Sequence, residues 1–460
     1  MQASHNHSAG RIPTAQSQPR IQTPSPEIPA DRDQWRFQTV RGAMEWIEEY
    51  RPGGYHPVYL GGLFNQRYKV LRKLGYGSYS TVWLARDLSE SRYVALKILK
   101  ANVESPQELA ILTTLSDYDV KHPGYSCALR LLDHFNHTGP NGTHLCLVTE
   151  VLGPSIGDLL SPPWRKFRDS TRYPTTVVRE ISKQALLALQ HIHSAGVAHG
   201  DVYSGNLLCE IPNLDQETES EVLHDVWEPL ETELVRRKDG LCPEGGDPWA
   251  PHRLYFPQPL QGTQEAPRIV LSQLKAKLTD FGGGGSTSQL PHTPLPFRAP
   301  ERIMTSKTEA LLDEKIDIWS IGFLTLFLVT DAVPLDLYLE DGEDATDDHH
   351  LLQLHDLLGP LPPSITRLWV RYDQYFDSHG QQIRNTPIGV DDVVSSPQTL
   401  RGFLSENRPL DMTESEMDDL LTMLTKMLRY DPADRVGAAE ALREPWLDAQ
   451  KYQLRQKQPE

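Results

Sequence analysis

Cysteine is scarce in this sequence. Only four of the 460 residues are cysteines, and no two of them have the CxxC spacing that is typical of zinc and redox sites. They are Cys127, Cys146, Cys209 and Cys242. This scarcity excludes a disulfide framework, and we expect reduced thiols in an intracellular compartment.

Long apolar runs are also missing. The first residues, up to about position 30, lack the apolar core of a signal peptide. The most apolar segment, IDIWSIGFLTLFLVTD at 316–331, has acidic residues near both ends, and it is shorter than the ~18 apolar residues that a membrane-spanning helix needs. Because it is apolar on all sides, it predicts a helix buried in a large core.

Positive charge is in deficit. Lys and Arg number 45 and Asp and Glu number 62, so the formal net charge at pH 7 is −17. Such a chain binds nucleic acid poorly and is repelled by anionic membrane surfaces, whereas basic proteins are attracted to it. We therefore expect basic protein partners, no direct contact with nucleic acid or membrane, and a monomer.

The chain is long enough for two substantial lobes, each with its own core. Residues 1–34 are rich in Ser, Gln, Pro, Asn and His and predict a disordered N-terminal tail. Alternating apolar residues from Tyr68 onward predict a small β-rich N-terminal lobe, which spans 35–151 with its extension. Helical patterns predict a larger C-terminal lobe over 152–450 and a short tail over 451–460. The expected fold class is therefore α+β with two lobes.

The predicted C-terminal lobe contains one strongly amphipathic segment and one interruption. In VVREISKQALLALQHIHSAG the apolar residues fall on one helical face, and Gly196 follows as the C-terminal stop. An insertion at about 211–267 is acidic and then rich in Pro and Gly, which predicts a mobile segment with one short helix near 222–235. Further helical patterns close the chain at 350–358, 414–429 and 437–448.

A glycine-rich turn and a lysine occur in the predicted strands. In LGYGSYSTVWLA, Gly75 and Gly77 let the backbone approach a ligand and cover phosphates with N–H groups, although any β-hairpin also uses glycine. In VALK, alternation favours an inward direction for Lys97, where a buried ammonium needs an anion. Glu108 in the following helical segment is the best-placed partner, and Glu104 is the second choice. The alternative is a lysine at a solvated strand edge.

Two further motifs offer acidic and amide oxygens. In HGDVYSGN, Asp201 can accept or orient a hydroxyl proton, and Asn206 can offer a neutral oxygen to Mg²⁺. In KLTDFGG, Asp280 follows a short strand and can ligate Mg²⁺ with a hard anionic oxygen. Each motif alone could also be an ordinary polar turn.

The order of these motifs is more specific than any one of them. The chain has a glycine loop, a strand lysine, a helix glutamate, H-x-D-x4-N, D-F-G and then APE at 299–301, which is the set that marks protein kinases. From Tyr68 to Leu447 the sequence resembles the eukaryotic protein kinases. GGYHPV, the glycine loop with Ser80, NGTHLCLVTEVLG and the long insertion before D-F-G resemble the SR-protein kinases. These are serine/threonine kinases of the CMGC group that phosphorylate Ser-Arg repeats.

This resemblance implies roles for individual residues. Asp201 would be the catalytic base, Lys97 would hold the ATP phosphates and pair with Glu108, and Asn206 and Asp280 would hold Mg²⁺. Thr149 would be the gatekeeper beside the hinge, and Glu301 would pair with Arg435. The residues that would surround ATP are Leu74, Gly75, Gly77, Val82, Ala95, Lys97, Glu108, Glu150 and Leu152. The resemblance also implies Arg/Ser-rich substrates, a role in the regulation of mRNA splicing, and residence in cytoplasm and nucleus.

Three positions depart from the usual kinase pattern. Gly200 replaces the arginine that binds a phosphate on the activation segment, so we expect constitutive activity without obligatory phosphorylation there. Tyr203 replaces the lysine that meets the transferring phosphate, and an uncompensated loss of that cation would lower the rate by about 10²–10³. HTPLPFRAPE keeps Arg298 but lacks part of the polar pattern expected of SR-protein kinases.

An acidic run lies in the predicted C-terminal lobe. EDGEDATDD at 340–348 predicts part of an acidic groove for Arg-rich substrates, although a solvated acidic loop is the alternative.

Two other functions are compatible with parts of the catalytic loop. Tyr203 favours a second function, a catalytically weak or inactive pseudokinase scaffold that binds basic partners. H-G-D followed by Asn also occurs in small-molecule kinases, but APE, Trp319 and Arg435 belong to a peptide-binding platform that such kinases generally lack.

Overall fold

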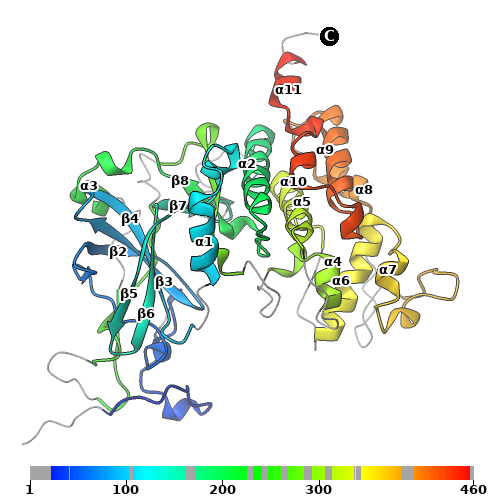
Figure 1. Cartoon of the computed structure of the whole chain (residues 1–460). Helices are drawn as coiled ribbons and strands as arrows, with labels where there is room; N and C mark the ends of the chain where they lie inside the picture. The colour runs from blue at the N-terminus through cyan, green and yellow to red at the C-terminus, as the bar shows by residue number, and fades with distance from the viewer. Residues whose placement is uncertain are drawn as a thin grey trace, which may run out of the picture.

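A β-sheet lobe and a helical lobe lie side by side, as Figure 1 shows. The computed structural model describes residues 22–40, 42–103, 107–160, 172–224, 232–240, 247–260, 268–283, 293–305, 313–335, 337, 343–384 and 398–455. The arrangement confirms the predicted α+β fold with two lobes.

The small lobe is built on an antiparallel sheet with the strand order β1-β2-β3-β4-β6-β5. Its strands are β1 (Leu63–Phe64), β2 (Tyr68–Gly77), β3 (Ser80–Asp87), β4 (Arg92–Leu99), β5 (Leu131–Gly139) and β6 (Gly142–Thr149). Successive strand residues point to opposite faces, so Val94, Leu96 and Ile98 share one buried apolar face while Lys97 points to the other side. Helix α1 (Gln107–Asp117) buries Glu108 and Ile111, which lie one turn apart.

Two long helices form the centre of the large lobe. These are α2 (Thr175–Ser194) and α5 (Lys315–Thr330), which contact each other. Around them lie α4 (Pro300–Thr305), α6 (Glu343–Leu358), α7 (Pro363–Thr366), α8 (Leu400–Asn407), α9 (Glu414–Met427), α10 (Ala438–Ala441) and α11 (Ala449–Arg455). The predicted apolar face of α2 is buried, and Gly196 follows with φ +74°, a conformation that glycine adopts readily. Helix α5 is buried along almost its whole length, as its uniform apolar character predicts.

The C-terminal end differs from the sequence prediction in two places. The pattern at 437–448 forms α10 and a separate 3-10 turn at Pro445–Leu447, because Pro445 has no N–H to continue a helix. Helix α11 then extends through 449–455, into the segment for which the sequence predicts a tail.

A small sheet between the lobes carries the motifs. Its strands are β7 (Leu152–Ser155), β8 (Leu207–Glu210) and β11 (Ala276–Leu278), in the order β11-β8-β7. Asn206 immediately precedes β8, and Asp280 follows β11 by two residues. Because β8 and β11 are antiparallel, with Leu207 opposite Leu278, the two motifs meet at one edge of this sheet.

The insertion packs against the small lobe, whereas the sequence predicts a mobile segment. Helix α3 (Glu219–His224) begins earlier than the predicted helix, and residues 225–231 lie outside the described residues. Thr232–Leu234 is a strand, β9, which pairs with β10 (Arg253–Tyr255). Apolar side chains of the insertion join two clusters on the small lobe. The first contains Leu71, Leu84, Tyr93, Ile211, Leu214, Val222 and Leu260, and the second contains Phe37, Ile47, Tyr50, Tyr55, Ala250 and Leu254.

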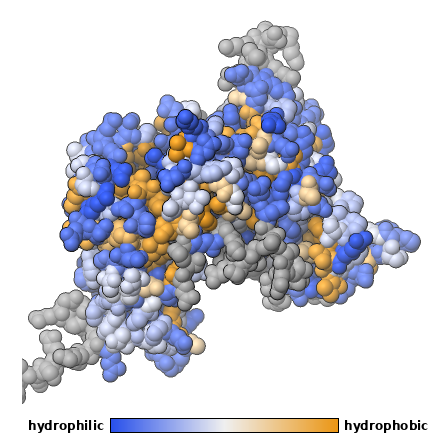
Figure 2. Space-filling view, in the orientation of Figure 1, coloured by the Kyte–Doolittle hydropathy of each residue, from blue (hydrophilic) through white to orange (hydrophobic). Residues whose placement is uncertain are grey.

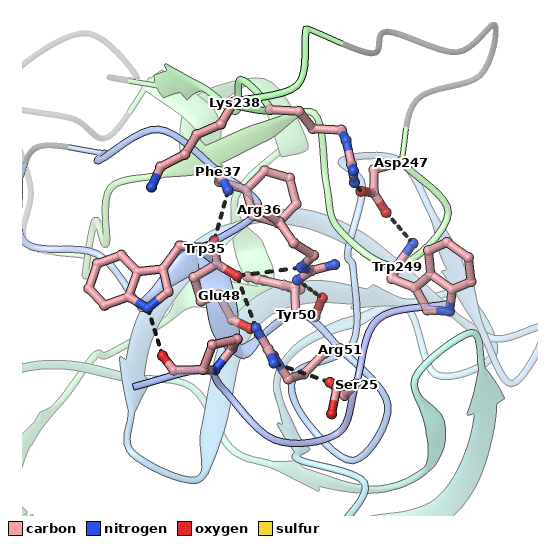
Figure 3. A network of polar contacts seen from close by, with 12 residues as sticks. Ser25, Trp35, Arg36, Phe37, Glu48, Tyr50, Arg51, Lys238, Asp247 and Trp249 are labelled. Carbon is pink, nitrogen blue, oxygen red and sulfur yellow. Dashed lines mark hydrogen bonds and ion pairs between the residues drawn. The ribbon is translucent and has the colours of Figure 1, made fainter. Parts of the chain in front are cut away.

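Polar networks order the N-terminal extension and the insertion that lies beside it, as Figure 3 shows. Glu48 is 1% exposed and accepts hydrogen bonds from the backbone N–H of Phe37 at 2.8 Å and from Arg51 Nη2 at 2.9 Å. A β-bridge joins Phe37 to Arg237 of the insertion, whose guanidinium binds Asp247 at 2.7 Å. Arg51 also reaches back to the backbone of the 22–34 segment, where the sequence predicts disorder.

Hydrophobic residues are unevenly distributed over the face of the molecule that Figure 2 shows. On the face in Figure 2, hydrophobic side chains gather over the strands of the small lobe, and the helical lobe is mostly hydrophilic. Within the described ranges, no helix combines the length and apolar character needed to cross a membrane.

Candidate active site

Lys97 joins the small lobe to the D-F-G motif. Its Nζ lies 2.6 Å from Glu108 Oε1 on α1 and 3.0 Å from Asp280 Oδ1 after β11. Burial lowers the pKa of Lys97, but the two carboxylates outweigh this effect, and its pKa lies above the ordinary value. Lys97 in turn lowers the pKa of Asp280, which keeps that carboxylate ionised. The predicted pair is therefore formed with Glu108, while Glu104 lies outside the described residues.

A buried carboxylate fixes the loop that precedes Asp201. Asp317 on α5 accepts hydrogen bonds from the backbone N–H groups of His199 and Gly200, each at 2.7 Å, and its Oδ2 lies 2.9 Å from His193 Nε2. The side chain of His199 bridges to the carbonyl of Thr279 at 2.9 Å. The loop is thus held both to α5 and to the segment between β11 and the D-F-G motif.

Asp201 and Asn206 contact each other directly. Asn206 Nδ2 donates to the Asp201 carbonyl at 2.8 Å and to Asp201 Oδ2 at 3.0 Å. Asp201 Oδ1 is buried and has no hydrogen-bond partner within the described part of the chain. Burial raises the pKa of Asp201 and Asp280 adds to this effect, whereas His199, Asn206 and the hydroxyl of Thr293 oppose it. One oxygen of this carboxylate thus remains available for a substrate hydroxyl.

The donor set fits a divalent cation that is bound together with phosphate. The Nδ2 of Asn206 is occupied by Asp201, so its amide oxygen remains as a neutral ligand, and Asp280 supplies an ionised carboxylate. Within the described residues, no cluster of three or more His, Cys, Asp or Glu side chains could hold a metal ion by itself. Mg²⁺ typically takes one or two carboxylates and completes its shell with substrate phosphates and water, which agrees with this set.

The predicted nucleotide-site residues lie on neighbouring strands. Gly75 pairs with Val82, Val82 with Lys97, and Ala95 with Thr149, so these positions follow one another across the sheet. Gly77 is exposed, and a side chain added at either glycine would meet nothing within 4 Å. Leu74 packs against the cluster formed with the insertion. The register therefore brings the predicted residues of β2, β3, β4 and β6 together.

The side chain of Glu150 has a structural partner that the sequence did not reveal. Its Oε2 lies 2.7 Å from Lys277 Nζ on β11, and its Oε1 accepts from the backbone N–H of Arg130 at 3.0 Å. Leu152 is buried in β7. The Glu150 carboxylate thus ties the hinge to β11, and only the backbone of this residue could serve a nucleotide.

The N-terminal extension holds the glycine loop, a contact that the motifs did not predict. Tyr55 Oη donates to the Gly77 carbonyl at 2.7 Å. Glu45 forms a buried ion pair with Lys73, just before the loop, and accepts from Tyr50 Oη at 2.6 Å. Lys73 is 1% exposed, and its burial lowers the pKa of its ammonium despite the nearby carboxylate. The only sequence feature that pointed to a role for the extension was the GGYHPV segment, which contains Tyr55.

The APE motif is anchored as the resemblance implies. Arg435 binds Glu301 through two parallel contacts, of 2.8 Å from Nη1 to Oε1 and 3.0 Å from Nη2 to Oε2. Arg435 is 1% exposed and lies over the Trp319 ring at 5.1 Å. This pair fixes the end of the activation segment to the large lobe, whereas residues 284–292 of the segment lie outside the described residues.

The two substituted loop positions have distinct local roles. Gly200 has φ +78°, a conformation that few other residues adopt readily. The ring of Tyr203 lies against Gly205, because a Cβ at Gly205 would come within 2.5 Å of it. Burial raises the pKa of Tyr203, and the carboxylates of Asp201, Asp280 and Asp158 add to this rise. The tyrosine is therefore neutral at pH 7 and brings no positive charge to the site.

Part of the predicted acidic groove is internal. Asp348 is 2% exposed and accepts hydrogen bonds from Trp369 Nε1 at 2.6 Å, Arg371 Nε at 2.6 Å and Tyr375 Oη at 2.8 Å. Asp344 is exposed but pairs with the same Arg371 at 2.9 Å. Asp348 thus serves the packing of α6, because its charge is already bound by three donors, while Glu340 and Asp341 lie outside the described residues.

Comparison with known proteins gives a consistent result. The sequence profile of the protein kinase domain matches residues 68–215 and 268–447. A serine/threonine protein kinase of Aspergillus fumigatus is 30% identical over 442 residues, which are 93% of this chain and 97% of that protein. The serine/threonine-protein kinase SRPK of Physarum polycephalum is 29% identical over 425 residues, 88% of this chain and 91% of that protein.

Two further similarities cover a shorter segment and the fold. The human SRSF protein kinase 3 is 36% identical over 166 residues, which are 35% of this chain and 28% of that protein. A crystal structure of a kinase domain is similar with a TM-score of 0.56 over 86% of this chain and 99% of its own, at 20% sequence identity. At that identity the structural likeness concerns the fold alone.

Proposed function

Since this chain belongs to the protein kinase family, as a serine/threonine kinase of the SR-protein kinase type, we propose that it phosphorylates serines in Arg/Ser-rich proteins. ATP is the phosphate donor and a divalent metal ion is required, as in protein kinases generally. We further propose that the metal is Mg²⁺, which Asn206 and Asp280 would hold. The observation that carries the proposal is the assembled set of Lys97, Glu108, Asp280, Asn206 and Asp201.

The residues have complementary parts in the transfer. The serine hydroxyl oxygen attacks the γ-phosphorus of ATP, the bond from that phosphorus to the β–γ bridging oxygen breaks, and ADP leaves. Asp201 accepts the hydroxyl proton through its unoccupied Oδ1. Lys97, held by Glu108, orients the α- and β-phosphates, and the glycine loop covers them. Asn206 and Asp280 would hold Mg²⁺, which would neutralise charge on the phosphates.

The geometry supports activity without phosphorylation of the activation segment. The pair between Lys97 and Glu108 is closed, and Asp317 holds the catalytic loop through the backbone of Gly200. With glycine at this position, the loop has no guanidinium there to receive a phosphate. We therefore propose that the kinase is constitutively active.

Charge supports a basic substrate. The chain carries a net charge of −17, which attracts Arg-rich peptides. This attraction becomes stronger as the salt concentration falls. Because Asp348 is internal, the attraction would rest on other acidic side chains of the large lobe. Cytoplasmic and nuclear residence and a role in mRNA splicing belong to the same proposal and follow from the resemblance to SR-protein kinases. A monomeric state is proposed with them.

A pseudokinase scaffold is the second candidate, because Tyr203 brings no cation to the catalytic loop. The test is transfer of radiolabelled phosphate from Mg-ATP to an (Arg-Ser)₈ peptide and to an Arg-free serine peptide. Labelling of the Arg-Ser peptide that disappears in Asp201→Asn is the expected result. Absence of transfer to either peptide, with ATP still bound, would replace the kinase proposal by the scaffold. Equal labelling of both peptides would refute Arg/Ser specificity alone.

A further inference from the structure

The catalytic loop has no positively charged side chain at position 203, where kinases usually have a lysine. Asp201 carries a negative charge next to Asp280, and Tyr203 stands where the resemblance to kinases places a lysine. Phosphoryl transfer develops negative charge that cationic groups stabilise, and removal of one such group typically costs about 10²–10³ in rate. A working site therefore needs a cation from another element.

Arg302 lies in the position to provide it. This residue follows Glu301 on α4 and is 8% exposed, so its guanidinium is inside the protein. Its Nη1 donates to Thr293 Oγ1 at 3.1 Å and to the carbonyl of Gly200 at 3.3 Å. Gly200 is the residue immediately before Asp201. The guanidinium thus reaches the catalytic loop from the side of the activation segment.

Thr293 connects the two elements. It is 2% exposed, and its hydroxyl donates to the Gly200 carbonyl at 2.8 Å while it accepts from Arg302. Arg298 Nε donates to the Thr293 carbonyl at 2.7 Å, which fixes the backbone of the same residue. Arg302, Thr293 and the backbone of Gly200 therefore form one bonded unit next to the catalytic aspartate.

The charge of Arg302 is retained at this site. Burial and the neighbouring Arg298 lower the pKa of Arg302 to about 10, while the carboxylate of Asp201 raises it. The guanidinium is thus protonated at pH 7, and the carboxylate of Asp201 contributes to its stabilisation. A buried cation without a functional reason would be costly, and an apolar side chain could fill the same space.

We propose that Arg302 supplies the positive charge beside Asp201 that is missing at position 203, and that it positions the catalytic aspartate through Thr293 and the Gly200 carbonyl. This inference rests on the proposed kinase activity. Arg302 is a positioning residue, since it acts through Thr293 and Gly200. The cation would then lie on helix α4, which begins within APE, in place of the catalytic-loop position that Tyr203 occupies.

The first test compares side chains of similar length at position 302. Arg302→Met should lower kcat on the (Arg-Ser)₈ peptide about 100-fold and leave the KM for ATP within about threefold. Arg302→Lys keeps the charge and should recover at least a tenth of the wild-type kcat. Arg401→Met is the matched control, because Arg401 is exposed and pairs with Asp418 away from the site. Thermal unfolding and binding of a fluorescent ATP analogue show whether each variant is folded.

The decisive test restores the lysine. In the double variant Tyr203→Lys with Arg302→Met, kcat should rise at least tenfold above Arg302→Met alone, because the cation returns to the loop. A merely structural arginine would not be replaced by a lysine at position 203. Unchanged kcat in folded Arg302→Met, or no recovery in the double variant, would overturn the inference while leaving the kinase proposal intact.

A second variant covers the case in which Arg302→Met does not fold. Thr293→Val keeps the shape of the threonine and removes the hydroxyl that links Arg302 to Gly200, and kcat should fall at least tenfold. A kcat within threefold of wild type would contradict the positioning role. A wild-type chain that binds ATP and transfers no phosphate would refute both the inference and the kinase proposal.

Discussion

The buried pair of Glu45 and Lys73 links the N-terminal extension to the strand that leads into the glycine loop. Glu45 is 4% exposed and Lys73 1% exposed, and the carboxylate also accepts a hydrogen bond from Tyr50 Oη. Glu45→Leu removes the carboxylate and keeps most of the volume. Lys73 would then have to remain charged without this anion or release its proton, and both outcomes destabilise the folded state.

The size of the effect follows from the two bonds that are lost. Removal of one partner of a buried ion pair costs about 3–5 kcal/mol. A buried hydroxyl left without an acceptor, here that of Tyr50, costs a further ~1–3 kcal/mol. The free energy of unfolding should therefore fall by about 4–8 kcal/mol. In the double variant Glu45→Leu with Lys73→Met no charge is stranded, so the loss should shrink to that of the hydroxyl alone.

Urea unfolding followed by tryptophan fluorescence measures this free energy, and Trp35 and Trp46 report from the extension itself. Glu49→Gln is the control, because Glu49 pairs with Lys100 at 2.7 Å with 30% of its side chain exposed and should lose about 1 kcal/mol or less. The reasoning fails if Glu45→Leu costs no more than this control, or if the double variant is no more stable than Glu45→Leu.

Three further perturbations test other parts of the structure. Tyr55→Phe removes the hydrogen bond to the glycine loop, worth about 1 kcal/mol, and should raise the KM for ATP about fivefold in steady-state kinetics, whereas exposed Tyr79→Phe should not. Glu301→Gln breaks the pair with buried Arg435 and should lower the free energy of unfolding by about 3–5 kcal/mol; an unchanged urea midpoint would contradict this. Burial, assisted by two neighbouring histidines, lowers the pKa of His56 from 6.5 to about 3. The unfolded chain therefore binds more protons between these pH values, and stability is complete above pH 6.5 and falls toward pH 3, by up to about 1.4 kcal/mol per pH unit for this residue. His56→Phe should flatten this dependence in urea titrations, and identical slopes would refute the assignment.

The sequence predicted which motif residues come together, because these residues lie in short motifs whose spacing reflects local backbone geometry. Lys97 and Asp201 are examples, since each sits at a fixed offset within a strand or turn. Contacts between distant segments left no such signal. The hydrogen bond from Tyr55 to Gly77 and the one from Arg302 to Thr293 depend on the tertiary fold, which brings separate segments together.

Composition also misled the prediction for the insertion and the acidic run. The acidic and Pro-rich insertion holds few apolar residues, but those few, such as Leu254, meet the extension and become buried. Asp348 belongs to an acidic run that predicts solvent exposure, yet three donors from distant positions enclose it. In both cases the residue is buried because it contacts residues from a distant part of the sequence, which composition does not reveal.

The packing of Phe37 and Ile47 against Ala250 and Leu254 has a consequence for synthesis in the cell. The extension leaves the ribosome before the insertion, and its apolar partners follow about 200 residues later, which at ~5–20 residues per second is a delay of ~10–40 s. During this interval the sheet from Tyr68 to Thr149 is already complete in sequence and can hold Glu45 and Tyr55, while Phe37 and Ile47 still lack Ala250 and Leu254. Nascent chains halted before the insertion should thus expose Phe37 and Ile47, and a chaperone that holds apolar segments would have its target there.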